Sequence, residues 1–126
     1  AKPTIEQRTD LTRNEVIGMP SNDEIRRVEW GSTWGEIVET QIRVDGVYTN
    51  VDADSYSAQL ETYGTEPEKV ADLSCTKIDT GTYVMWFYAD KTLYDPLANY
   101  YLSFTWEYSG KTQVKRVPVR IEVGVK

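Results

Sequence analysis

Residues 99–125 read NYYLSFTWEYSGKTQVKRVPVRIEVGV and contain two stretches of alternating side chains. Apolar residues occupy every second position from Tyr100 to Tyr108, and again from Val117 to Val125. A period of two is the pattern of a β-strand with one buried face. Ser109-Gly110 separates the two stretches and has the small residues that a tight hairpin turn needs. These residues predict a terminal β-hairpin and an all-β fold.

Turn signals recur along the rest of the chain at intervals of about ten residues. The clearest are Asp45-Gly46 and Asp79-Thr80-Gly81, because these residues tolerate positive φ. Between the turns we expect further strands at residues 25–30, 34–44, 56–61, 70–78 and 82–89. With the terminal hairpin this makes about seven strands and no helix. The sequence therefore predicts an Ig-like antiparallel β-sandwich rather than a small barrel.

The chain of 126 residues has the length of one domain. Residues 1–24 show no sustained periodicity and include Pro3, Gly18 and Pro20, so we expect an extended N-terminal arm. Within the arm, a short strand is expected near residues 4–8. Residues 25–126 are expected to form the sandwich, with the arm docked on a neighbouring subunit.

Charge is unevenly placed in a chain whose net charge is −6. Residues 31–110 hold most of the acidic side chains, whereas residues 111–126 hold five basic residues against Glu122. An acidic body argues against nucleic acid as a partner. The basic last strand could meet an acidic partner, or its lysines could simply protect a sheet edge.

Catalysis is not expected from this composition. The chain has no histidine, which removes the commonest general base and metal ligand. Its aspartates lie mainly in turns, where backbone hydrogen bonding explains them. The single Cys75 is expected to point inward as a small apolar residue. We therefore expect a protein that is not an enzyme and has no cofactor.

A metal site is not expected either, although one loop is a weak candidate. Asn50, Asp52 and Asp54 alternate in a loop and could offer oxygen ligands to Ca²⁺. The loop lacks the glycine and the distal glutamate of an EF-hand, so turn formation is the simpler explanation.

Aromatic residues are numerous, with four tryptophans and nine tyrosines. Most are expected in the core, because they fall on strands at buried positions. Tyr83, Phe87 and Tyr101 have the opposite parity to Trp86 and Trp106, and we expect them to form an exposed aromatic surface. Such a surface would suit a protein partner. The alternative is a carbohydrate-binding β-sandwich module.

Three segments carry a resemblance to a known family: residues 34–46 (WGEIVETQIRVDG), 79–92 (DTGTYVMWFYADKT) and 100–112 (YYLSFTWEYSGKT). The pattern resembles the Ig-like sandwich domains of tailed-phage structural proteins, in particular the N-terminal domain of baseplate upper proteins. Capsid cement and decoration proteins use similar sandwiches. The resemblance covers residues 25–125 and rests on turn and strand patterns.

This resemblance implies a virion structural protein, made in the host cytoplasm. We expect a non-enzymatic accessory subunit, of the capsid cement or decoration type or a tail or baseplate attachment subunit. It would clamp capsid or tail subunits and form a homo-oligomer in the assembly, with no nucleic acid and no membrane as partner. The residues expected to bind these partners are Ile5, Leu11, Val16, Ile17, Met19, Lys115, Arg116 and Arg120.

Overall fold

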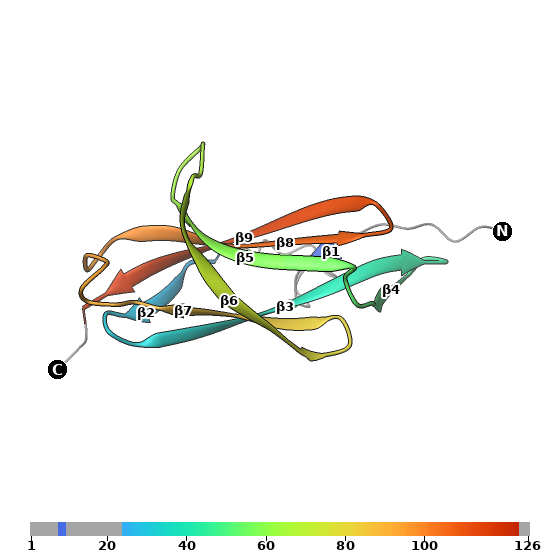
Figure 1. Cartoon of the computed structure of the whole chain (residues 1–126), viewed down its shortest axis with the longest axis horizontal. Helices are drawn as coiled ribbons and strands as arrows, with labels where there is room; N and C mark the ends of the chain where they lie inside the picture. The colour runs from blue at the N-terminus through green and yellow to red at the C-terminus, as the bar shows by residue number, and fades with distance from the viewer. Residues whose placement is uncertain (1–7, 10–23, 124–126) are drawn as a thin grey trace.

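A computed structural model describes residues 8–9 and 24–123 of the chain (Figure 1). These residues form nine strands and no helix. The strands are β1 (Arg8–Thr9), β2 (Arg26–Glu29), β3 (Thr33–Val44), β4 (Val47–Asn50), β5 (Ser55–Thr62), β6 (Lys69–Asp79), β7 (Thr82–Tyr88), β8 (Asn99–Tyr108) and β9 (Lys111–Glu122).

The strands form one curled sheet. Its hydrogen-bonded order is β1-β3-β7-β6-β5-β8-β9-β2, and β4 pairs with β3 beside this path. All pairs are antiparallel except β2 with β9, which is parallel. The curl brings β2 and β3 together although they lie far apart along the path. Two hydrogen bonds, each 3.0 Å long, join the Arg26 guanidinium of β2 to the Glu36 carboxylate of β3.

The strand β6 turns the sheet from one side of the molecule to the other. It pairs with β5 through residues 69–73 and with β7 through residues 74–79, and each pairing contains a register shift. In Figure 1, β5, β8 and β9 lie together above β3 and β7, and β6 crosses between the two groups. The inner faces of the two groups therefore face each other.

The core fills the space between these inner faces. Every second residue of β7 and β8 points into it, as the strand period requires. Tyr83 lies at the centre, and its ring centroid is 4.4 Å from that of Tyr56 and 5.5 Å from that of Phe104. The residues buried most completely are Val28, Val38, Leu60, Tyr83, Met85, Phe87, Leu102, Phe104, Trp106, Val117, Val119 and Ile121.

The terminal hairpin forms as the sequence predicts. The strands β8 and β9 pair along ten residues each, from Asn99 with Arg120 to Tyr108 with Lys111. Ser109 and Gly110 both have positive φ, at 53° and 79°, which is the geometry of a type I′ turn. Asp45 and Gly46 form a turn of the same kind, at 51° and 84°. The prediction of an all-β chain with these two turns is confirmed.

Three details differ from the prediction. The described residues form nine strands rather than about seven: β4 was not predicted, and β1 is the short strand expected in the arm. The sheet is mixed rather than wholly antiparallel, because β2 runs parallel to β9. A pairing between residues so far apart leaves no local signal. The short strand lies at Arg8–Thr9, and the rest of the predicted arm, residues 1–7 and 10–23, falls outside the described residues.

Candidate functional site

Arg116, predicted to meet an acidic partner, is paired within the chain. Its Nε donates a hydrogen bond of 2.7 Å to Oε1 of Glu61 on β5. Glu61 is only 4% exposed, and its other oxygen accepts a 2.5 Å hydrogen bond from the Gln59 side chain. A carboxylate removed from water needs such partners to stay charged. Arg116 therefore stabilises a buried group on its own sheet.

Arg120 also lies beside a carboxylate of this chain. Its Nε is 3.4 Å from Oε2 of Glu122, and the same oxygen accepts a 2.8 Å hydrogen bond from Arg27 of β2. Lys115 is engaged in an interaction as well. Much of the positive charge of β9 is thus balanced locally, and its role toward an acidic partner stays a prediction. Ile5, Leu11, Val16, Ile17 and Met19, the other residues predicted to bind a partner, lie outside the described residues.

The prediction of an exposed surface at Tyr83 and Phe87 is wrong. Both side chains lie in the core, with exposures of 0% and 1%. Tyr101 is half-buried, and its ring lies 4.9 Å from that of Tyr63. Residues 82–89 are apolar at both parities, so the alternation alone did not tell which face of this strand is buried.

Two residues of the opposite parity on β7 are exposed, whereas Val84 on the same face is only 5% exposed. Trp86 is 45% exposed and Tyr88 is 54% exposed. With their neighbours on β3 and β6 they form what we call the β7 outer face. It consists of three cross-strand rows: Thr33 with Tyr88, then Gly35 with Trp86 and Ser74, then Ile37 with Val84 and Thr76.

Trp86 lies directly on Gly35. A Cβ atom added to Gly35 would come within 2.6 Å of Cζ3 and 3.0 Å of Cε3 of the indole. The benzene part of the ring therefore covers the backbone of β3, where no side chain stands in its way. Glycine opposite an aromatic residue was the sequence signal for this contact, but the signal is readable only once the pairing of β3 with β7 is known.

Three exposed aliphatic residues lie in the loop between β7 and β8 and directly after β9. Leu93, Leu97 and Val123 are 69%, 52% and 54% exposed, and we call them the Leu97 end. Leu97 has a φ of 68°, which is unusual for a bulky residue. Its N–H donates a 2.6 Å hydrogen bond to the carbonyl of Ile121, and this bond fixes the loop against β9. Nothing local in Asp95-Pro96-Leu97 predicted this conformation.

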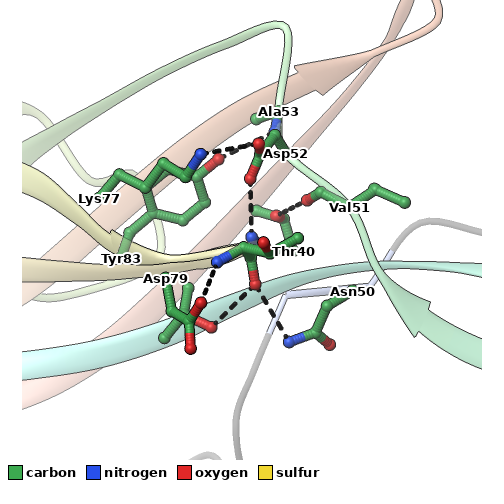
Figure 2. A network of polar contacts seen from close by, with 11 residues as sticks. Thr40, Asn50, Val51, Asp52, Ala53, Lys77, Asp79 and Tyr83 are labelled. Carbon is green, nitrogen blue, oxygen red and sulfur yellow. Dashed lines mark hydrogen bonds and ion pairs between the residues drawn. The ribbon is translucent and has the colours of Figure 1, made fainter.

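The weak calcium candidates Asp52 and Asp54 are held by protein groups, and Figure 2 shows the contacts of Asp52. Oδ2 of Asp52 accepts a 2.7 Å hydrogen bond from Lys77 Nζ, and Oδ1 accepts one of 2.8 Å from the N–H of Gly81. Asp54 points elsewhere, because its Oδ2 accepts a hydrogen bond from the N–H of Ser109. Within the described residues, no three Asp, Glu or Cys side chains gather as metal ligands would.

This network fastens the loop after β4 to the turn between β6 and β7. The hydrogen bond from Lys77 is the main cause that lowers the pKa of Asp52, and the same bond raises the pKa of Lys77. The Tyr83 hydroxyl accepts a 2.9 Å bond from the N–H of Ala53. A Cβ on Gly81 would come within 2.8 Å of the backbone of Val51, so only glycine allows the loop this close. The arrangement is a structural clamp.

The outer side of β5, β8 and β9 has a shallow depression of about 340 Å³. Small side chains with hydroxyl groups from all three strands line it. The Glu107 carboxylate accepts a 3.3 Å hydrogen bond from Ser55. The residues that line it are Ser55, Tyr56, Ser57, Thr105, Trp106, Glu107 and Thr112.

Cys75 packs against the core, as predicted, and is half-buried. Burial raises the pKa of its thiol to about 11, so the thiol is protonated at neutral pH. A protonated thiol is a poor nucleophile and a poor metal ligand. Cys75 is thus a small apolar residue of β6.

Comparison of the chain with models of protein families, with curated proteins and with solved structures found no significant match. Among the described residues there is also no helix with the length and apolarity needed to span a membrane.

Proposed function

We propose that the curled sheet is an Ig-like sandwich. In the constant-type immunoglobulin fold, strands A, B, E and D form one sheet and strands C, F and G form the other. The order β1-β3-β7 corresponds to A-B-E, and β5-β8-β9 corresponds to C-F-G. The strand β6 takes the place of D beside β7 and also pairs with β5. The parallel strand β2 extends the second sheet beyond β9.

We further propose that the protein is a non-enzymatic accessory subunit of a phage virion, of the cement, decoration or tail-attachment type. It contacts neighbouring subunits, copies of itself included. The resemblance of residues 25–125 to phage Ig-like domains suggests the virion setting. Because a fold does not fix a function, the docking role needs support from a surface of this chain.

The observation that carries the docking role is the conformation of Leu97. A leucine at positive φ is strained by about 1–2 kcal/mol, and it commonly persists where the surrounding structure and the function require it. Here the strain presents an aliphatic side chain to solvent, and the Leu97 N–H joins this loop to Ile121, two residues before the exposed Val123. Exposed apolar side chains that gather at one place are typical of a protein contact.

Such a subunit would act by mass action. A clamp that binds the assembled coat or tail lattice and not its separate subunits stabilises each site by RT ln(1 + [L]/Kd), and repetition over many sites adds avidity. The net charge of −6 on each copy opposes self-association at low salt. Added salt shortens the screening length from about 10 Å at 0.1 M to about 3 Å at 1 M, so association should strengthen.

Light scattering after size-exclusion chromatography tests this function. The full chain should form a discrete oligomer at high salt, and the double variant Leu93→Ser/Leu97→Gly should be a monomer. Val47→Ser is the matched control, because Val47 is 63% exposed on β4, away from the Leu97 end. Removal of residues 1–24 tests the predicted arm in the same way. A full chain that stays monomeric at every concentration and salt would overturn the proposal.

A further inference from the structure

The β7 outer face differs chemically from the rest of the surface. Its eight positions include aromatic, aliphatic and hydroxyl side chains and one glycine, and none of them is charged. This stands out in a chain whose residues are 27% charged. Trp86 is the most exposed of the four tryptophans, and Tyr88 follows it two positions along the same strand.

The indole of Trp86 is positioned in advance of any ligand. Its benzene part rests on Gly35, which offers no Cβ to tilt it away from the sheet. One side of the ring is therefore used within the protein, while the side chain keeps 45% of its surface exposed. An aromatic ring held against a strand needs little ordering on binding, which favours affinity.

From this geometry we propose that the β7 outer face is a binding site for a neutral oligosaccharide. The C–H groups on one face of a pyranose ring carry slight positive charge and meet the negative face of an aromatic ring. Trp86 and Tyr88 stand about 7 Å apart along the strand, so an oligosaccharide rather than a single sugar contacts both. Thr33, Ser74 and Thr76 border the rings with exposed hydroxyls for the sugar's own hydroxyl groups.

Two other occupants fit less well. A cationic ligand over an aromatic ring usually gains from a nearby carboxylate, and none of the eight positions provides one. A second copy of the chain would bring a further net charge of −6, which opposes association at this face as it does at the Leu97 end at low salt. A neutral saccharide meets neither objection, because it has no charge to balance and has both apolar faces and hydroxyl edges.

Gly35 acts in this site as a positioning residue. In Gly35→Ala the new methyl group would occupy the place of the indole, so the ring must leave the strand surface. Trp86 would still be present, but its ring would no longer rest on β3. The two variants Gly35→Ala and Trp86→Ala should therefore weaken saccharide binding alike, by about tenfold or more.

Saturation-transfer difference NMR on the sugar protons tests the site without relying on tryptophan as the reporter. The full chain is mixed with maltohexaose, cellohexaose or chitohexaose at millimolar concentration. At least one of these should show saturable transfer, strongest at the ring C–H protons. Transfer should be lost in Gly35→Ala and Trp86→Ala. Tyr63→Ala is the matched control, since Tyr63 is 53% exposed but packs beside Tyr101.

The outcomes separate this proposal from the docking role of the Leu97 end. No transfer with any of the three sugars overturns the saccharide site, as does transfer that survives Trp86→Ala. If Trp86→Ala instead abolishes an oligomer seen by light scattering, the β7 outer face is a protein interface and the saccharide assignment is wrong. The Leu93→Ser/Leu97→Gly variant should bind sugar as the original chain does.

Discussion

The two outer sides of the sheet differ in the side chains that they expose and in how these are paired. On β5, β8 and β9, the long polar side chains are matched within the chain, as Arg116 is by Glu61 and Glu61 by Gln59. On β3 and β7, the exposed rings of Trp86 and Tyr88 meet only small uncharged neighbours across the strands. The first side stabilises the fold, whereas the second has apolar surface to offer a ligand.

The largest expected effect follows from removing Arg116. Arg116→Ala leaves the buried Glu61 carboxylate with Gln59 as its remaining hydrogen-bond partner. Because Arg116 is half-exposed, water can reach the site and replace part of the lost hydrogen bond to Glu61. We therefore expect a loss of about 2–3 kcal/mol in the free energy of unfolding. Urea denaturation measures it. Arg120→Ala is the control and should cost less than about 1 kcal/mol, because Glu122 keeps Arg27. Equal losses in Arg116→Ala and Arg120→Ala would contradict the conclusion that Arg116 stabilises a buried carboxylate.

The next effect comes from the contact of Trp86 with Gly35. The change in the free energy of unfolding caused by Gly35→Ala should have opposite signs in the presence and in the absence of Trp86. In the original chain, Gly35→Ala displaces the indole and should lower stability by about 1 kcal/mol. In a Trp86→Ala background the same change should raise stability by about 0.5 kcal/mol, because alanine suits a strand better than glycine. Unfolding of the four proteins completes a double-mutant cycle. Additive effects would mean that the ring does not rest on Gly35.

A comparison at Leu97 separates backbone strain from side-chain contact. Leu97→Ala and Leu97→Gly both remove the exposed side chain, but only glycine relieves the φ of 68°. The glycine variant should therefore be the more stable of the two by about 1 kcal/mol in thermal or urea unfolding. Equal stability of the alanine and glycine variants would show that the backbone at Leu97 is unstrained. The docking role would then lose the support of this conformation.

How far the sequence predicted this structure depends on the range of each interaction. The terminal hairpin follows from local alternation and from Ser109-Gly110, and both are confirmed. The buried face of β7 was predicted wrongly, because both parities are apolar. Gly35, which settles the orientation of Trp86, lies on another strand. The parity of a doubly apolar strand is thus decided by its neighbours rather than by its own residues.

The candidate site shows the same limit. Lys115, Arg116 and Arg120 were selected for their charge, yet Arg116 and Arg120 lie beside Glu61 and Glu122 of this chain. Glu61 lies 55 positions away in the sequence from Arg116, so its burial could not be predicted. Leu97 gave no signal at all, because no glycine or asparagine marks its positive φ. Composition predicted a chain without catalytic groups, and pairing in space now identifies its two outward surfaces.

The smallest effect concerns the exposed ion pair of Asp52 with Lys77. Its size can be compared with that of the pair of Arg116 with the buried Glu61. The pKa of Asp52 is lowered from 3.8, so its contribution to stability is present above that value and is lost as pH falls through the lowered pKa. The pKa of Lys77 is raised from 10.5, so its contribution is lost only as pH rises through the raised value.

Asp52→Asn keeps an acceptor for Gly81 but removes the charge. It should flatten the pH dependence of the urea midpoint below about pH 4. Asp72→Asn is the control for a still more exposed pair, that with Lys69. If Asp52→Asn matched Arg116→Ala in size, exposure would not distinguish the two pairs, and the contrast between the two sides of the sheet would lose its physical basis.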